Sequence, residues 1–190
     1  MTLIVGFGNK ARSGKDAAGE AVLTHFTRSQ ETLKKHLGRA HKPYAVKLYK
    51  FAEALYRECR ELHGMVEKDS PLLQNVGLQR RKEDESYWIC KVSDQITTDN
   101  PDLALITDVR FKNEANFIKH QNGVLINVRR LNSNGSLFIA SDRSCDHPSE
   151  TELDYYPWDH FITAHTGESA LAGQLAITIV EYEKGLRWTR

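Results

Sequence analysis

The chain has few cysteines, no long hydrophobic run and almost no net charge, and each shortage argues against a class of protein. Three cysteines stand far apart among 190 residues, which predicts reduced thiols in a cytoplasmic compartment rather than a disulfide framework. No apolar run approaches the length of a membrane-spanning helix, so we expect no membrane partner. The formal charge of +1 argues against a general nucleic-acid-binding surface, and we expect no direct nucleic-acid binding.

The composition is that of a globular protein. Hydrophobic residues make up 40% of the chain and charged residues 27%. A chain of 190 residues fits one domain and is long enough to bury a sizeable core. Met1-Thr2-Leu3 leads straight into an apolar run, so we expect no signal peptide.

The most informative segment is Gly8-Asn9-Lys10-Ala11-Arg12-Ser13-Gly14-Lys15-Asp16, directly after the apolar run 3–7. A strand, a glycine-rich turn, a Gly-Lys pair and a helix-forming stretch form the context in which such a loop binds phosphate. Backbone N–H groups and a helix N-terminus then converge on one point, where an anion is favoured. Lys15 would add a point charge there. The segment predicts binding of a nucleoside triphosphate; the alternative is an ordinary strand–turn–helix with a solvated lysine.

Two positions depart from the usual loop pattern. Asn9 stands where the first glycine is expected, but Asn tolerates a positive φ better than other non-glycine residues. A loop of normal length that starts at Asn9 is one interpretation, and a loop one residue longer that starts at Gly8 is the other. Asp16 stands where Ser or Thr normally offers a hydroxyl to Mg²⁺.

Hydrophobic periodicity predicts alternating strands and helices. Strands are expected at 3–7, 44–48, 103–107, 124–128 and 159–163, and helices at 16–27, 50–63, 87–96, 113–120, 168–184 and, on a weaker pattern, 68–81. Residues 29–43 are expected to be a helix end followed by an exposed connection. Residues 129–157 lack periodicity, which is typical of a lid, a binding loop or disorder. The alternation predicts an α/β fold with a mostly parallel sheet covered by helices on both faces.

Three further segments belong with the loop. The first is Thr107–Ala115, which contains Asp-Val-Arg-Phe-x-Asn-Glu-Ala and is followed by a glycine-led strand at 123–126. The second is His147-Pro148-Ser149-Glu150-Thr151, and the third is Leu73-Gln74-x-x-Gly77 with Arg80, Arg81 and Trp88 downstream. In order and spacing, these segments resemble the deoxynucleoside monophosphate kinase family best known from bacteriophages.

In that family Asp normally follows the loop lysine, so Asp16 is a family trait. Asn9, Ala17 in place of Thr, and Ala164-His165 at the end of the last strand are departures from the family pattern. They bear on how metal and adenine are bound more than on the reaction.

The resemblance implies one P-loop kinase domain over residues 1–190, with an acceptor-binding insertion at about 50–98 and a lid at about 129–157. It implies phosphoryl transfer from ATP, with Mg²⁺, to a deoxynucleoside 5′-monophosphate for DNA precursor synthesis. The partners would be these two nucleotides, in the cytoplasm of a host cell if the source is viral. The oligomeric state stays open, a homodimer included.

Phosphoryl transfer requires cations that converge on the moving phosphoryl group. The residues expected to bind ATP are Asn9, Arg12, Ser13, Gly14, Lys15, Asp16 and Ala17. The residues expected to be catalytic are Lys15, Asp108, Arg110, Arg130 and Arg143. Mg²⁺ prefers oxygen ligands and keeps several waters, so Asp16 and Asp108 are its expected ligands, directly or through water.

Each of these assignments has a plainer alternative. Asp108 could instead cap the next helix, and Arg110 could form an ion pair with Glu114 rather than clamp the acceptor phosphate. Arg129, Arg130 and Arg143 flank the aperiodic stretch as arginines flank a closing lid, but they could also belong to a solvated loop.

The residues expected to bind the acceptor are Lys50, Phe51, Gln74, Arg80, Trp88, Arg110, Glu114, Ser149 and Glu150. Gln74 is favoured because its amide donates and accepts at once. For Phe51 and Trp88 the alternative is a place in the core, and for Lys50 and Glu114 it is a solvated surface. Ser149 could instead cap a helix, with Glu152 as its partner.

Two other functions stay open. One is a P-loop kinase for another small phosphorylated acceptor, because animal-type phosphomevalonate kinase has a similar Ser-Gly-Lys loop and dephospho-coenzyme A kinase shares the fold. The other is a non-catalytic nucleotide-binding module, which the departures at Asn9 and Ala17 would suit.

Overall fold

The structure, a computed structural model, describes residues 2–37, 44–141 and 145–188. The chain divides into two compact units. The first, here called the sheet unit, is formed by Met1–Leu48 together with Pro101–Arg190. The second, here called the helical unit, is Tyr49–Asn100. Each unit is described by itself.

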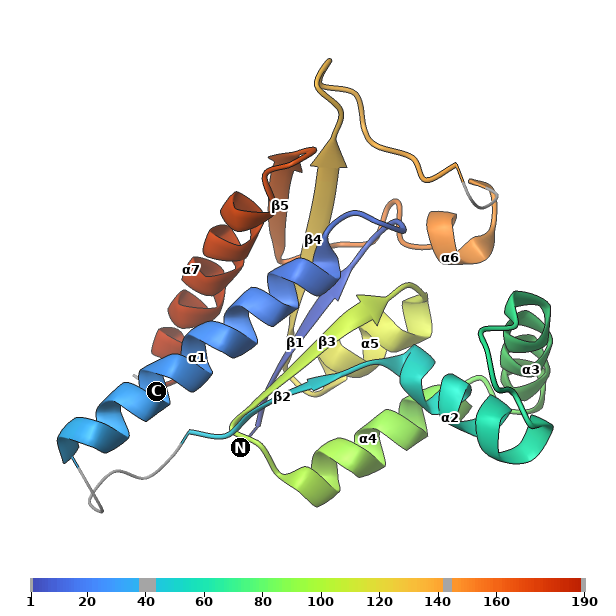
Figure 1. Ribbon diagram of the computed structural model, residues 1–190, viewed down its shortest axis with the longest axis horizontal. Coiled ribbons are helices and arrows are strands. Elements are labelled where there is room, and N and C mark those ends of the chain that lie inside the picture. The colour runs from blue at the N-terminus through green and yellow to red at the C-terminus, as the bar shows by residue number, and fades with distance from the viewer. Residues whose placement is uncertain (1, 38–43, 142–144, 189–190) are drawn as a thin grey trace. The chain divides into compact units, whose positions relative to one another are not determined.

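The sheet unit is built on five strands (Figure 1). They are β1 (Leu3–Gly8), β2 (Val46–Tyr49), β3 (Leu103–Val109), β4 (Val124–Leu131) and β5 (His160–His165), in the order β2-β3-β1-β4-β5. The pairs β1–β3, β1–β4 and β4–β5 are parallel. The expected α/β fold with a mostly parallel sheet is therefore confirmed.

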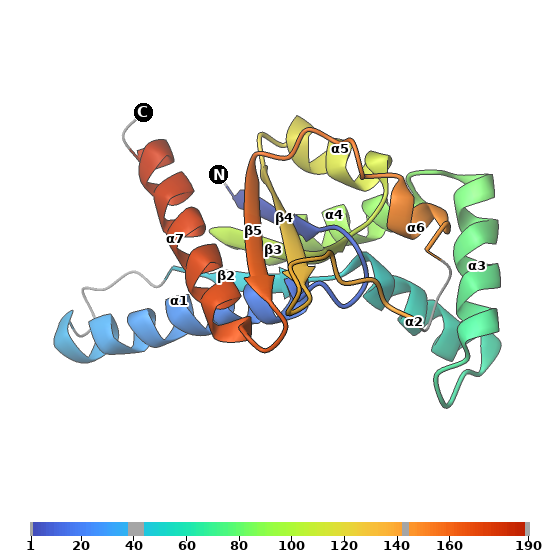
Figure 2. The same ribbon diagram turned by 90° about the horizontal axis from the view of Figure 1, so that it is seen from above.

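Helices cover both faces of this sheet (Figure 2). The first and last helices, α1 (Lys15–Leu37) and α7 (Ser169–Trp188), lie side by side on one face, and α5 (Lys112–His120) packs against β1 and β4 on the other. Alternate residues of β1 serve the two faces: Leu3, Val5 and Phe7 join the core under α1 and α7. Gly6 lies under α5, where an added Cβ would come within 2.5 Å of the Ile118 side chain.

The first helix is longer than the sequence pattern predicts. A helix end and an exposed connection are expected over residues 29–43, but α1 continues to Leu37. Nothing in 29–37 breaks a helix, since the next glycine is residue 38. Lys34, Lys35 and His36 occupy the last turn, where positive charge interacts favourably with the helix dipole. The polar composition of this stretch marks an exposed helix rather than a connection.

The helical unit consists of α2 (Phe51–His63), α3 (Ser70–Glu83) and α4 (Tyr87–Asp99). Asp69 starts α3 because its side chain accepts a hydrogen bond from the N–H of Leu72 at 2.9 Å. Gly64 and Asn100 end α2 and α4 in the left-handed conformation. One cluster holds the unit together: Cys59, Met65, Leu73, Val76 and Trp88.

The strand order places a topological switch at β1. The chain first builds the β2–β3 side of the sheet and then crosses to the β4–β5 side. In open parallel sheets, ligands bind at the carboxyl ends of the strands at such a switch. The segments at these ends are residues 9–14 after β1, 108–110 at β3, 129–131 at β4 and 165–167 after β5.

None of the described helices is both long enough and apolar enough to cross a membrane. All three cysteines lie in the described part of the chain and are unpaired, Cys59 buried and Cys90 and Cys145 exposed.

The packing of α1 on β3 requires a glycine in the helix, and this can be tested. An added Cβ at Gly19 would lie 2.3 Å from Cγ2 of Thr107, which is fully buried. We expect Gly19→Ala to lower the free energy of unfolding by about 1–3 kcal/mol, measured by urea denaturation. Thr107→Ser removes that methyl group and keeps the hydroxyl, so it should rescue Gly19→Ala.

The control is Gly185→Ala in α7, where nothing lies within 4 Å of the added Cβ. There the better helix propensity of Ala should be neutral or stabilise by up to about 1 kcal/mol. Equal effects at the two glycines would contradict the packing described for Gly19.

Candidate functional site

Residues 9–14, here called the N-terminal loop, connect β1 to α1. Three of them have positive φ: 102° at Asn9, 55° at Arg12 and 98° at Gly14. The positive φ at Asn9, and the place of Gly8 in β1, favour the interpretation of a loop of normal length that starts at Asn9. Asn9 Nδ2 donates to Oδ1 of Asn127 on β4 at 2.6 Å, which fixes the start of the loop.

Gly8 has no room for a side chain. An added Cβ would lie 2.5 Å from the Trp158 ring and 2.7 Å from the Val109 carbonyl oxygen. The glycine therefore lets β1, β3 and Trp158 approach one another directly below the N-terminal loop.

Lys15 is the first residue of α1 and is almost completely buried, with 3% of its surface exposed. Its Nζ donates to the Lys10 carbonyl oxygen at 3.2 Å, so the side chain folds back under the N-terminal loop. Burial, and then the positive charge of Arg110, lower the pKa of Lys15 from 10.5 to about 8. Three carboxylates oppose this shift: Asp16, Asp108 and Glu150. Four charged groups are thus close enough to Lys15 to act on it.

Ser13 is buried in the N-terminal loop, and its Oγ has no hydrogen-bond partner among the described residues. A buried hydroxyl without a partner is uncommon, and it often marks a place where a ligand or water completes the bonding. This hydroxyl lies two residues before Lys15, at the opening of α1.

Asp16 is held by a neighbour in β3. Thr107 Oγ1, which is fully buried, donates to Asp16 Oδ1 at 3.1 Å. A threonine hydroxyl is therefore present next to position 16, although it comes from β3 and not from residue 16 itself. Asp108 does not cap the next helix, because α5 begins at Lys112. The described residues contain no group of three or more His, Cys, Asp and Glu arranged to hold a metal.

Arg110 pairs with Glu150 rather than with Glu114. Its Nη1 lies 2.6 Å from Glu150 Oε1. Glu114 is buried, not a surface carboxylate, and it accepts the backbone N–H groups of Arg110 at 2.8 Å and Phe111 at 3.1 Å. Glu114 therefore shapes the backbone between β3 and α5, while the Arg110 side chain is directed at the segment 148–154.

Glu150 lies in the short helix α6 (Pro148–Thr151) and reaches the N-terminal loop. Its Oε2 accepts the N–H of Ala11 at 2.8 Å, and its carbonyl oxygen accepts a hydrogen bond from Lys10 Nζ at 2.7 Å. The cap of α6 is His147, whose Nδ1 accepts the N–H of Ser149 at 3.2 Å, so the alternative of Ser149 as the cap is wrong. Residue 147 takes this place because Pro148 occupies the first helical position.

Arg130 also lies against the N-terminal loop. Its Nη1 is 3.5 Å from the Arg12 carbonyl oxygen, its Nε donates to Thr166 Oγ1 at 3.0 Å, and its guanidinium lies 4.1 Å from the ring centroid of Phe138. Arg129 stacks on Phe161 instead. Arg143 lies outside the described residues. Arg12, Ser13, Lys15, Asp16, Asp108, Arg110 and Arg130 come from segments at or directly after the carboxyl ends of β1, β3 and β4, and Glu150 joins them from α6.

The remaining expected residues lie in the helical unit. Phe51 and Trp88 are each 2% exposed, so a nucleotide base could stack on neither ring unless the helices moved. Gln74 is exposed and Lys50 half-buried. Arg80 Nε donates to Glu58 Oε1 at 2.7 Å, and its Nη1 donates to Glu83.

Sequence reasoning missed Glu58 and Tyr87, which share this network. Burial opposes ionisation of Glu58, but hydrogen bonds from Tyr87 and Arg80 hold the pKa of its carboxyl below the usual range. It also missed Lys10 and Asn127. Asn127 did carry a signal, since it is a polar residue inside the apolar run 124–128.

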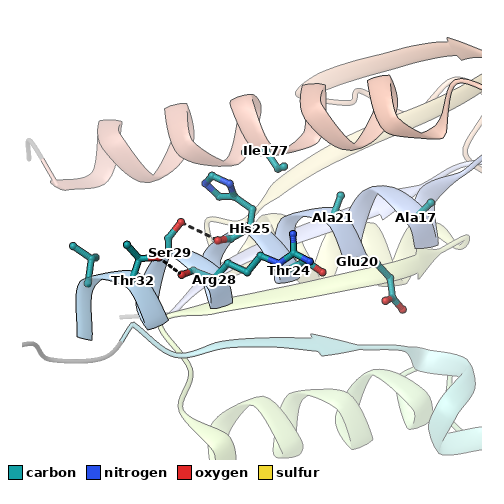
Figure 3. Close-up of a pocket in the computed structure, with 10 residues that line it drawn as sticks. Ala17, Glu20, Ala21, Thr24, His25, Arg28, Ser29, Thr32 and Ile177 are labelled. Atoms are coloured by element: carbon teal, nitrogen blue, oxygen red, sulfur yellow. Dashed lines mark hydrogen bonds between the residues drawn. The ribbon is translucent and has the colours of Figure 1, made fainter. Parts of the chain in front are cut away.

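A groove elsewhere on the sheet unit is distinct from this site. A groove of about 940 Å³ runs along α1 and is lined by Ala17, Glu20, Ala21, Thr24, His25, Arg28, Ser29, Thr32, Leu33 and Ile177 (Figure 3). It shares only Ala17 with the residues expected to bind ATP. None of the charged groups around Lys15 lines it.

Comparison with known proteins finds a relative by sequence. The chain is 36% identical over 89 residues to the deoxynucleoside-5′-monophosphate kinase of Escherichia phage T5. The match covers 43% of this chain and 33% of that relative, so it spans only a third of the kinase. It agrees with the resemblance drawn from the motifs. No family model matches the chain.

Comparison of structures gives the fold. An unliganded sugar kinase from Janibacter sp. HTCC2649 superposes with a TM-score of 0.51 over 95% of each chain, at 10% sequence identity. At this identity the likeness speaks for the fold alone. The chain has a kinase-like α/β fold.

The burial of Lys15 predicts a distinct pH dependence of stability. The difference between 10.5 and about 8 corresponds to a cost of about 3 kcal/mol at pH 7. Because the unfolded chain keeps this proton above pH 8 and the folded protein does not, the contribution of Lys15 to the stability of the wild type should rise between pH 8 and 10.5. Lys15→Met lacks the titrating group.

We therefore expect Lys15→Met to be more stable than the wild type at pH 7, and this advantage should shrink by about 3 kcal/mol by pH 10.5. Urea denaturation of both proteins across this range measures it. Loss of the bond to the Lys10 carbonyl adds a part that does not depend on pH. A stability difference that is constant from pH 7 to 10.5 would contradict the buried state of Lys15.

Proposed function

We propose that this protein transfers the γ-phosphoryl group of ATP to a deoxynucleoside 5′-monophosphate, giving ADP and the deoxynucleoside diphosphate. The observation that carries the proposal is the N-terminal loop. At the start of a helix it buries a lysine ammonium and a serine hydroxyl that has no hydrogen-bond partner within the described parts of the chain. Such a site favours an anion with several oxygens.

The triphosphate fits these groups. Backbone N–H groups at residues 13–16 lie where α1 starts, and the Ser13 hydroxyl would donate to a phosphate oxygen. A bound polyphosphate would also compensate the cost of burying Lys15, because it brings negative charge to the ammonium. Asn9, Arg12, Gly14 and Ala17 would complete the ATP site as part of the same turn.

Asp16 and Asp108 suit a Mg²⁺ site, with or without intervening water. Mg²⁺ bound to a nucleotide takes few protein ligands and keeps several waters, so two carboxylates near Lys15 are sufficient. When bound, the ion would neutralise charge on the β- and γ-phosphates. Thr107 would hold the Asp16 carboxylate in place.

Two arginines are the further cations available for transfer. Arg110 stands at the end of β3, next to the strand that precedes the N-terminal loop, and would clamp the acceptor phosphate. Arg130 already contacts the N-terminal loop and would stabilise charge on the donor phosphates. We propose residues 129–157, with Arg143, as a lid that excludes water during transfer.

For the acceptor we propose Gln74, Lys50 and Arg80 as residues that bind the base and the sugar. We also propose Ser149 and Glu150 as acceptor-binding residues, and Glu114 as a residue that acts by fixing the backbone of Arg110. The similarity to the T5 deoxynucleoside-5′-monophosphate kinase favours this acceptor class over phosphomevalonate. Because that match is partial, the acceptor has to be tested directly.

The test is a panel of acceptors with ATP and millimolar Mg²⁺, followed by ADP release. The panel holds the four standard deoxynucleoside monophosphates, their ribose counterparts and phosphomevalonate. We expect turnover with at least one deoxynucleotide. Lys15→Met should remain folded and lower kcat/KM by at least about a thousandfold, because it removes the ammonium that would stabilise negative charge on the transferred phosphoryl group.

Other outcomes lead to other functions. Turnover with phosphomevalonate alone would identify a different kinase. ATP binding without any product would identify a nucleotide-binding module. Wild-type turnover in Lys15→Met would contradict the assignment of the N-terminal loop as the donor site.

The role of Thr107 gives a second prediction. Thr107→Val keeps the volume of the side chain but removes the hydroxyl that holds Asp16. We expect about a tenfold rise in the Mg²⁺ concentration needed for half-maximal activity. Mn²⁺ binding in the presence of ATP, followed by electron paramagnetic resonance, should weaken in parallel.

Thr107→Ser keeps the hydroxyl and is the matched control. It should bind Mn²⁺ like the wild type. If Thr107→Val and Thr107→Ser bound Mn²⁺ equally well, the hydrogen bond to Asp16 would have no part in holding the metal.

A further inference from the structure

The Glu150 side chain connects two parts of the site that are far apart in sequence. One carboxylate oxygen, Oε1, lies 2.6 Å from Arg110 Nη1, and the other, Oε2, accepts the Ala11 N–H at 2.8 Å. The side chain is 6% exposed, so both bonds are formed away from bulk water. A buried charge-assisted bond of this length is strong and directional.

Only a carboxylate can form both bonds at once. Ionised Glu offers an acceptor on each oxygen, whereas the Gln amide offers one acceptor and one donor group. In Glu150→Gln, the NH₂ group would have to face either the Arg110 guanidinium or the Ala11 N–H, and both are donors. One of the two bonds is therefore lost in that variant, although the side chain keeps its size.

The segment around Glu150 has other attachments. Lys10 Nζ donates to the Glu150 carbonyl oxygen and to Asp154 Oδ1 at 2.8 Å, and Glu152 Oε1 accepts the Lys112 N–H at 2.7 Å. Leu153 and Trp158 are buried. These contacts do not depend on the Glu150 carboxylate, so the segment should stay docked when the carboxylate is changed.

We propose that Glu150 is a positioning residue, which sets the Arg110 guanidinium relative to the N-terminal loop for phosphoryl transfer. The inference rests on the proposed function and specifies the part of Glu150 in it. Arg110 has five N–H donors, and the bond to Glu150 uses one at Nη1. The Glu150 carboxylate thus orients the Arg110 guanidinium and leaves its other N–H donors for an acceptor phosphate.

A positioning role differs from a purely structural role. A residue that only stabilised the N-terminal loop would, when lost, weaken ATP binding and lower the melting temperature. A positioning residue acts through Arg110, so its loss should lower kcat and have no further effect once Arg110 is gone. The two roles therefore separate in a double-mutant cycle.

The experiment compares Glu150→Gln, Arg110→Ala and the double variant, with Glu152→Gln as the matched control two residues away. We expect Glu150→Gln to lower kcat about tenfold to a hundredfold, as a misplaced reacting group does, while KM for ATP changes less than about threefold. In the Arg110→Ala background the same change should alter kcat less than about threefold. Glu152→Gln should keep wild-type kcat.

A measurement that does not require turnover distinguishes failure of this inference from failure of the proposed function. In ¹⁵N-arginine NMR spectra, the guanidinium signals of Arg110, assigned by their loss in Arg110→Lys, should be protected from exchange with solvent. Glu150→Ala, which removes both acceptor oxygens, should abolish this protection, and Glu152→Gln should leave it unchanged.

If the wild type turned over no acceptor but Arg110 were protected as expected, the proposed function would be wrong. The hydrogen bond from Arg110 to Glu150 would still be confirmed. Protection unchanged in Glu150→Ala would overturn the inference, whatever the activity. Multiplicative effects of Glu150→Gln and Arg110→Ala on kcat would also overturn it.

Discussion

The burial of a charged lysine at the first turn of α1 is the constraint on which the rest of the site depends. Lys15 has 3% of its surface exposed, so its ammonium loses most of its hydration, and a hydrogen bond to a loop carbonyl replaces only part of it. Asp16, Asp108 and Glu150 oppose the resulting fall in the Lys15 pKa but do not cancel it. The folded protein therefore carries an electrostatic cost at this point, which a bound polyanion would relieve. Stability given up at one position is common in sites that must bind a ligand.

The surrounding contacts place groups from several strand ends around this lysine. Asn127 fixes the first residue of the N-terminal loop, Thr107 fixes Asp16, and Glu150 connects Ala11 with Arg110. Each of these bonds joins residues that are far apart in the sequence. They are possible because β1 lies between β3 and β4, so that the loops after these strands open to the same edge of the sheet. Fold and site are thus determined by the same strand order.

The sequence was informative where the chemistry is local and less so where it depends on tertiary contacts. The N-terminal loop, the positive φ of Asn9 and the parallel sheet followed from residue types and their spacing. The partner of Arg110 did not, because Glu114 at helical spacing is a local candidate whereas Glu150 is forty residues away. The end of α1 was misplaced because an exposed basic helix and an exposed connection have the same polarity. Phe51 and Trp88 had both a core and a binding interpretation, and only the packing of the helical unit shows how deeply they are buried.

The central claim is that the N-terminal loop presents a γ-phosphoryl group to an acceptor. The most direct measurement is to incubate the protein with ATP labelled in its γ-phosphate, Mg²⁺ and each deoxynucleoside monophosphate, and to separate the labelled products. Unlike ADP release, this distinguishes transfer from hydrolysis. We expect label in a deoxynucleoside diphosphate with the wild type, and none there with Lys15→Met. Label found only in inorganic phosphate, or remaining in ATP with every acceptor, would contradict it.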